Sequence, residues 1–130
     1  MKERKLVITE FEEKLVEELS YDGIFFFIEK GIIPSKVDHE PAICWAVRQN
    51  SAEAVHALIV AGVDVTVNHN YAIKLAAWLG YTEMVVLLYE AGADITVEQN
   101  KPLQNAAKFG HFDTVKAITD IQVKLQNKTA

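Results

Sequence analysis

The side chains of this chain that are best suited to metal binding or nucleophilic chemistry are four histidines and one cysteine. His39, His56, His69 and His111 are never four residues apart, the spacing that brings two imidazoles together on a helix. Cys44 is the single cysteine, so the chain contains neither an internal disulfide nor a cysteine zinc site. The sequence has no glycine-rich phosphate loop and no GxSxG nucleophile motif. We therefore predict a protein that is not an enzyme, with no catalytic residue, cofactor or metal.

The chain is instead organised by an internal repeat. Residues 41–70 and 71–100 align without gaps, and 12 of their 30 positions are identical. Residues 101–118 begin a third copy, after which the pattern is lost. A fixed period of this length indicates stacked supersecondary units, each of which buries its apolar face against its neighbours. Arrays of this kind mostly bind other molecules.

Each repeat is predicted to contain two short helices and a loop. Asn and Gly tolerate the left-handed conformation at helix ends, and proline fits the first helical turn. These signals predict first helices that begin near Pro41, Tyr71 and Lys101 and end at Asn50, Gly80 and Gly110. They predict second helices over residues 51–61, 81–91 and 111 to about 126.

The predicted core repeats with the same period. The first helices share one apolar position (Ile43, Ile73, Leu103) and one alanine position (Ala46, Ala76, Ala106). Small residues let the helices of adjacent repeats approach closely. The second helices share a stripe with i, i+3, i+4 spacing: Val55, Leu58, Ile59; Val85, Leu88, Tyr89; Val115, Ile118, Thr119.

The pattern AxxxAAxxGxxExVxxLxxxGADI, which is best formed within residues 71–96, resembles the ankyrin repeat. This resemblance covers residues 41–118 and implies antiparallel helix pairs stacked into a curved all-α solenoid. It also implies loops that project along one edge, and a function in protein–protein recognition. We expect one domain over residues 1–130: an N-terminal capping repeat (1–40), repeats 41–70 and 71–100, and a C-terminal capping repeat (101–130).

Two features depart from the family's pattern. The Thr-Pro-Leu-His opening is absent, so the side-chain hydrogen bonds of that Thr and His must be missing or replaced. The period is 30 residues where the family usually has 33, and the shortfall comes in the projecting loops, VDVTVNHN and ADITVEQN. We expect these loops to be stubs. The short period is similar to that of degenerate ankyrin repeats in large DNA viruses and some phages.

The two ends are predicted to cap the array. Residues 10–20 form an acidic helical pattern with Phe11, Leu15 and Leu19 on one face, and residues 21–30 form a second helix that Gly31 ends. The apolar run of residues 24–28, which contains Phe25, Phe26 and Phe27, covers all sides of this second helix. The three phenylalanines are either buried on both sides or partly exposed as a patch for a partner or a second copy, and the sequence leaves both interpretations open. The last repeat loses its helix-ending glycine, which predicts a long closing helix.

The candidate binding residues lie on the first helices. Two rows of equivalent positions in the three repeats are expected to line the concave surface: Cys44, Lys74 and Gln104, and Arg48, Trp78 and Lys108. The next position along each first helix holds Gln49, Leu79 and Phe109. Trp and Arg are frequent hot-spot residues at interfaces. Trp78 is either a binding anchor or semi-buried core that covers Lys108, and Tyr71 and Tyr81 could extend an aromatic surface. The partner-binding residues are therefore predicted to be Arg48, Lys74, Trp78, Leu79, Lys108, Phe109, Tyr71 and Tyr81.

Composition limits the partners. The net charge is −5, and residues 1–40 hold 10 acidic and 6 basic side chains. An acidic chain is repelled by phosphate, which argues against nucleic acid, and no apolar run reaches membrane-spanning length. We expect an intracellular, cytoplasmic protein that binds a protein with an acidic contact segment. A small viral or phage inhibitor of a host protein would fit, in the host cytoplasm. The alternative is an assembly protein that self-associates through its terminal repeats, although a monomer is favoured over a homodimer.

Overall fold

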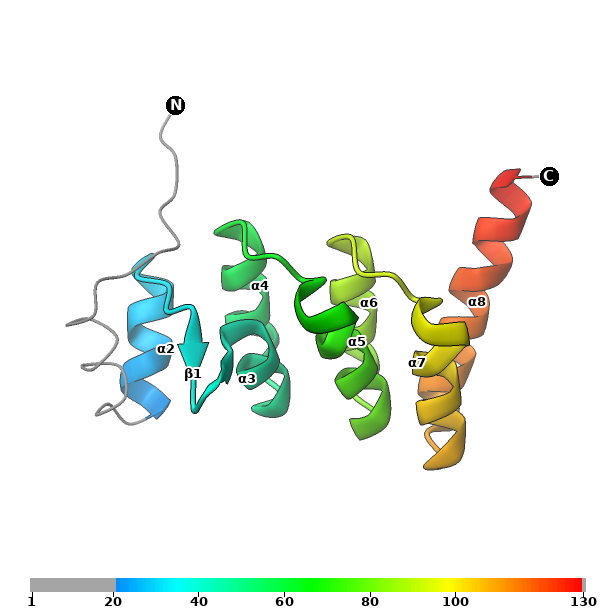
Figure 1. The fold of residues 1–130 in the computed structure, drawn as a ribbon, viewed down its shortest axis with the longest axis horizontal. Helices are drawn as coiled ribbons and strands as arrows, with labels where there is room; N and C mark the ends of the chain where they lie inside the picture. The colour runs from blue at the N-terminus through cyan, green and yellow to red at the C-terminus, as the bar shows by residue number, and fades with distance from the viewer. Residues whose placement is uncertain (1–20, 130) are drawn as a thin grey trace. The chain divides into compact units, whose positions relative to one another are not determined.

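The computed structural model describes residues 21–129 of the chain, and these are mainly helical (Figure 1). The fold is all-α and of the helical-repeat solenoid class, as the sequence predicts. The chain divides into two compact units, residues 1–64 and residues 65–130. The acidic helix expected over residues 10–20, with Phe11, Leu15 and Leu19, lies outside the described residues.

The described part of the first unit, residues 21–64, contains three helices and one short hairpin. Its elements are α2 (Tyr21–Glu29), β1 (Lys36–Val37), β2 (Glu40–Pro41), α3 (Ala42–Arg48) and α4 (Ala52–Val60). The strands pair antiparallel, with Val37 opposite Glu40. Asp38 and His39 between them both have positive φ, 53° and 66°, as a tight two-residue hairpin turn requires. The sequence predicted helices alone here, because strands of two residues leave no alternating pattern to detect.

The core of the first unit lies on α3, where all residues from Ala42 to Val47 are buried. Trp45 is 1% exposed and its ring centroid lies 5.0 Å from that of Phe25 in α2. The predicted second helix is confirmed as α4, and the Ser51 hydroxyl caps it by accepting a hydrogen bond from the Ala54 amide at 3.1 Å. This cap satisfies one of the helix's otherwise unpaired amides.

The aromatic run of α2 divides between core and surface. Ile24 and Ile28 are 2% exposed, whereas Phe26 is 53% exposed and Phe25 and Phe27 are half-buried. The helix ends where predicted, with Gly31 at φ 85°. Its apolar residues outnumber the positions that face its neighbours α3 and α4, which leaves the Phe26 ring at the surface.

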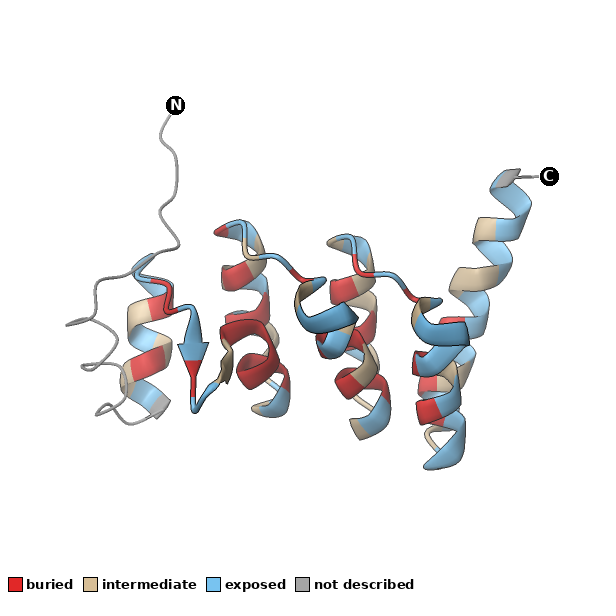
Figure 2. Cartoon of the chain, in the orientation of Figure 1, coloured by how far each residue is buried: buried red, intermediate tan, exposed pale blue. Residues whose placement is uncertain are grey.

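The second unit contains four helices, which follow the predicted pairs (Figure 1). They are α5 (Val67–Leu79), α6 (Thr82–Glu90), α7 (Val97–Lys108) and α8 (Phe112–Thr129). The core comes from the positions at which the repeat places apolar residues. Ile73, Ala76, Val85 and Leu88 are each 0% exposed. Figure 2 shows buried segments on the helices of this unit.

Three consecutive left-handed residues precede the right-handed part of α5 and again of α7. Asn68, His69 and Asn70 have φ of 56°, 57° and 60°, and residues 98–100 repeat this conformation. Right-handed helix therefore begins at Tyr71 and Lys101, as predicted. These compact turns take the place of projecting loops, in agreement with the stubs expected from the 30-residue period.

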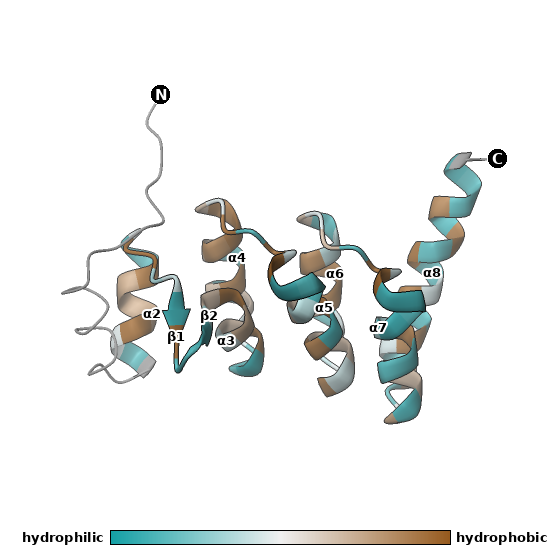
Figure 3. Ribbon diagram, in the orientation of Figure 1, coloured by the Kyte–Doolittle hydropathy of each residue, from teal (hydrophilic) through white to brown (hydrophobic). Residues whose placement is uncertain are grey.

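The last repeat buries less than the sequence predicts. Leu103 and Val115 are half-buried and Thr119 is exposed, although Ile73 and Val85, which occupy the positions of Leu103 and Val115 one period earlier, are fully buried. Figure 3 shows the same trend, since α7 is coloured mainly as hydrophilic and α3 as hydrophobic. Among the described residues, no element covers the outer side of this repeat.

Candidate functional site

The exposed residues of α5 and α7 form the surface on which most of the predicted binding residues lie. Side chains three and seven residues apart share one helix face. On α5 this face holds Tyr71, Lys74 and Trp78, and on α7 it holds Lys101, Gln104 and Lys108. Together with Phe109, these residues are the α5–α7 surface.

The centre of this surface is an aromatic pair. The rings of Trp78 and Phe109 stack with centroids 5.0 Å apart and planes inclined by 26°. Trp78 is 50% exposed and Phe109 is 43% exposed, so each ring keeps about half of its surface in water. The Lys108 ammonium lies 5.5 Å from the centroid of the Phe109 ring. Trp78 thus packs against Phe109.

The backbone of Trp78 is fixed from the following repeat. His111 Nε2 donates a hydrogen bond to the Trp78 carbonyl oxygen at 2.9 Å. Gly80, with φ of 76°, makes room for this contact, because a Cβ there would lie 2.5 Å from His111 Nδ1. The repeat pattern predicted no binding role for His111. Its place directly after Gly110, like Tyr81 after Gly80, was the signal that it follows a helix end.

The charges on this surface are partly neutralised within the chain. Lys74 Nζ lies 2.9 Å from Glu98 Oε2, and the Lys74 side chain is 14% exposed. The hydrogen bond from Lys74 lowers the pKa of the Glu98 carboxyl, against a smaller opposing effect of burial. The positive charges of His69 and Lys101 lower it further. No carboxylate forms an ion pair with Lys101 or Lys108 among the described residues, so the α5–α7 surface keeps a net positive charge.

Side-chain hydrogen bonds stabilise the two repeats that carry this surface, and Gln104 occupies the place of the missing His of the family's opening. Asn105 is 5% exposed and its Nδ2 donates to the Lys74 carbonyl at 3.1 Å. Gln104 Nε2 donates to the Gln99 carbonyl at 2.7 Å. Thr82 and Thr114 join the second helices through a hydrogen bond of 2.7 Å. The Asn105 bond joins α7 to α5 and the threonine bond joins α6 to α8, whereas the Gln104 bond lies within α7.

The remaining predicted residues are less prominent. Leu79 and Tyr81 are half-buried. Arg48 belongs to the first unit, where its Nε lies 3.0 Å from Glu40. Cys44, placed by the sequence in a row lining the surface, is instead 0% exposed, because α3 buries a wider face than α5 or α7. Lys101 was not predicted, although it lies one period after Tyr71.

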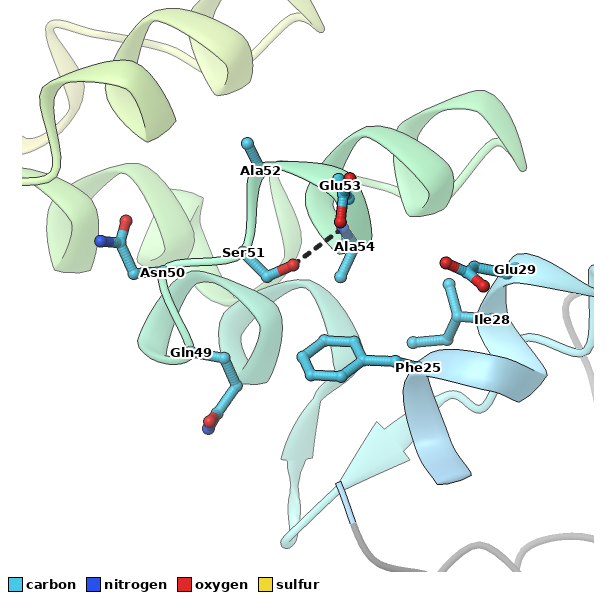
Figure 4. Close-up of a pocket in the computed structure, with 9 residues that line it drawn as sticks. All are labelled: Phe25, Ile28, Glu29, Gln49, Asn50, Ser51, Ala52, Glu53 and Ala54. Carbon is cyan, nitrogen blue, oxygen red and sulfur yellow. Dashed lines mark hydrogen bonds between the residues drawn. The ribbon is translucent and has the colours of Figure 1, made fainter. Parts of the chain in front are cut away.

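A separate pocket lies in the first unit, between α2 and the segment that joins α3 to α4 (Figure 4). Its volume is about 500 Å³. Phe25 and Ile28 point into it from α2, and Ser51 lies at the opposite side with its cap to Ala54. It is lined by Phe25, Ile28, Glu29, Gln49, Asn50, Ser51, Ala52, Glu53 and Ala54. Among the described residues that line the pocket, none is basic.

Residues 21–129 contain neither a metal-binding cluster nor a membrane-spanning helix. In this part of the chain, no three His, Cys, Asp or Glu side chains group closely enough to hold a metal ion. None of its helices combines the length and apolarity needed to cross a membrane.

Comparison with known families identifies the repeat. A family model described as ankyrin repeats, in three copies, matches residues 12–99 and residues 43–129. The chain therefore belongs to the ankyrin-repeat family, whose members serve as protein–protein interaction modules. Comparison with curated proteins and with solved structures found no significant match.

Proposed function

We propose that the protein acts without catalysis and binds one protein partner through the α5–α7 surface. The observation that supports this is the stacked pair of Trp78 and Phe109, with 50% and 43% of their surface in water. Rings that are held rigidly but remain exposed lose little conformational freedom when a partner covers them. Tryptophan is also the residue type most enriched among interface hot spots.

The chemistry of the surface favours a partner segment that is both apolar and acidic. An apolar or aromatic side chain would cover the Trp78–Phe109 pair. Carboxylates beside it would meet Lys101 and Lys108, for which the described residues provide no ion pair. Lys74 contributes less, because Glu98 already pairs with it. Arg48 lies in the first unit, so only the sequence pattern supports its contribution to the same binding surface.

We further propose that the partner is a host protein and that the chain acts in the host cytoplasm as a small viral or phage inhibitor. The support is the 30-residue period with stub loops, which resembles that of viral repeats. With short loops, the helix faces supply most of the contact area.

The test compares three forms of the chain as immobilised bait. They are the wild type, Trp78→Ala, and Val60→Ala as a control that removes another exposed apolar side chain (55% exposed). Bound proteins are quantified by mass spectrometry, and the partner is then titrated by calorimetry. We expect a partner retained by wild type and Val60→Ala, and weakened by about 2 kcal/mol or more by Trp78→Ala.

The charge contribution is tested separately with Lys108→Glu, using Lys36→Glu as the control in the first unit. We expect slower association and a weaker salt dependence for Lys108→Glu alone. A partner that binds all these variants with wild-type affinity, while they stay folded, would place the interface elsewhere.

A further inference from the structure

The C-terminal helix α8 has two different faces. Thr114 and Ile118 are 1% and 0% exposed and pack into the second unit. The opposite side carries a stripe at i, i+3, i+7 and i+11, formed by Phe112, Val115, Thr119 and Val123. Phe112 is 79% exposed and Val123 is 48% exposed. These four residues are the α8 stripe.

Comparison with the preceding repeat shows that the side of α8 with the α8 stripe carries residues of the type that is buried elsewhere. One period before Val115 lies Val85, which is 0% exposed, whereas Val115 is half-buried. Ala107 of α7 is exposed, although Ala77 one period earlier is 0% exposed. The last repeat thus keeps core-type residues on a side that no described element covers. In Figure 1, α8 also extends well past α7.

A row of alternating charges runs beside the stripe: Asp113, Lys116, Asp120 and Lys124. Lys116 and Asp120 lie 3.1 Å apart, and their side chains are 77% and 58% exposed. The order of charges in this row favours one particular partner, a second copy of the same helix. Its order of signs, negative–positive–negative–positive, is inverted when the helix is read backwards. The charge row is therefore complementary to itself in an antiparallel pair of helices, whereas in a parallel pair like charges would meet.

We propose that the protein forms a two-fold symmetric homodimer in which the α8 helices of two copies lie antiparallel. A two-fold axis near the middle of α8 brings Asp113 close to Lys124 of the second copy, and Lys116 close to Asp120. The same axis pairs Phe112 with the second Val123, and Val115 with the second Thr119. The contact is isologous, so it closes at two copies and does not extend into a fibre.

The interface is small, so association is weak. A helix of 18 residues is about 27 Å long. A contact of this length, with the exposed side of α7 at its edge, lies at the low end of specific interfaces. The dimer fraction should accordingly rise with protein concentration over about 1 to 200 µM, measured by sedimentation velocity or by size exclusion with light scattering.

The decisive experiment exchanges the charges. An acid variant carries Lys116→Asp and Lys124→Asp, and a base variant carries Asp113→Lys and Asp120→Lys. Each row then bears one sign, so each variant should be monomeric over the whole concentration range. An equimolar mixture should form a heterodimer, because the two rows are again complementary. The mixture also controls for folding, since unfolded variants would not associate specifically.

A second comparison tests the apolar contact. Phe112→Ser should lower the dimer association constant at least tenfold, whereas Phe26→Asp, at the other exposed phenylalanine patch, should leave it unchanged. Lys36→Asp with Lys30→Asp, both in the first unit, controls for the loss of two positive charges away from the stripe. A wild type that stays monomeric at every concentration, or assembles beyond two copies, would overturn the proposal. So would a dimer that survives both charge variants, a mixture without heterodimer, or a dimer lost in Phe26→Asp and kept in Phe112→Ser.

Discussion

At the scale of single residues, Cys44 shows how burial controls the chemistry of a side chain. Its thiol is 0% exposed on α3. Burial, assisted by the nearby Glu40 carboxylate and opposed by Arg48, raises the pKa of the Cys44 thiol to about 12. The thiolate is the reactive form of cysteine. The folded protein therefore holds this thiol in an unreactive state.

We predict that Cys44 resists thiol reagents in the folded protein. At about pH 8, a disulfide reagent such as Ellman's should react at least about a hundredfold more slowly than in guanidinium, where the thiol is exposed and its pKa is ordinary. Absorbance of the released chromophore measures the rate, and the denatured sample is the control. Equal rates in the two conditions would show that Cys44 is not buried.

The Lys74–Glu98 pair gives a prediction for acid pH. The pKa of Glu98 lies below its ordinary value of 4.5, mainly because Lys74 donates a hydrogen bond to the carboxylate. Ionised Glu98 therefore stabilises the folded state at neutral pH, and this contribution is lost as the pH falls through the lowered pKa.

We accordingly expect Glu98→Gln to melt below the wild type at neutral pH, by a small margin. The two melting temperatures should converge as the pH falls below 4.5. Thermal melts followed by circular dichroism measure the difference, and Glu90→Gln on α6 serves as an exposed control. A difference that persists undiminished at the lowest pH would exclude ionisation of Glu98 as its cause.

At the scale of helices, Ala76 tests the register of the repeat. Its side chain is 0% exposed on α5, which packs against both α6 and α7. Ala76→Leu adds three carbon atoms to this contact and should destabilise the protein by about 1–3 kcal/mol. Urea unfolding measures the change. Ala107→Leu, the same substitution at an exposed position of α7, should cost much less; equal losses would mean that Ala76 does not lie between packed helices.

The left-handed turns before α5 and α7 give a second prediction at this scale. Gln99 is exposed and has φ of 59°, in the region that side chains with a Cβ rarely adopt. Relief of about 1–2 kcal/mol of strain exceeds the extra backbone entropy that glycine loses on folding. Gln99→Gly should thus stabilise the protein by roughly 0.5–1 kcal/mol. Gln99→Ala keeps the Cβ and should bring no gain; if both variants gain equally, the strain is not at this residue.

At the scale of the whole chain, charge determines which polyanions can be bound. The net charge is −5 and the isoelectric point is near 5.3. We predict no retention on heparin and no shift of a duplex DNA probe at about 0.15 M salt, since specific and non-specific nucleic-acid binding both draw on basic charge. The chain should bind an anion-exchange resin instead. Retention on heparin that weakens steeply with salt would contradict this prediction, and would show that the local positive charge of Lys101 and Lys108 outweighs the net negative charge of the chain.

The sequence alone determined the helices and the family. The 30-residue period, the apolar positions and the glycines at 80 and 110 predict where helices lie and which residues are core, because helix period and helix ends depend on residues only a few positions apart. The period also predicted the short loops. The period did not predict burial correctly in the last repeat, because the burial of Val115 depends on whether a neighbouring element covers it. It also did not predict the hairpin around Asp38, because strands of two residues are too short to show a pattern.

The tertiary structure decided the candidate site. The pairing of Lys74 with Glu98, 24 residues away, and the stacking of Trp78 on Phe109, 31 residues away, depend on how α5 and α7 align. The same alignment exposes half of the indole and leaves Lys101 and Lys108 without an ion pair among the described residues. These outcomes are set by the relative placement of side chains distant in the chain, and no local pattern encodes that placement. The sequence therefore named most residues of the surface, though not Lys101, and the packing of the helices determined which of them a partner can reach.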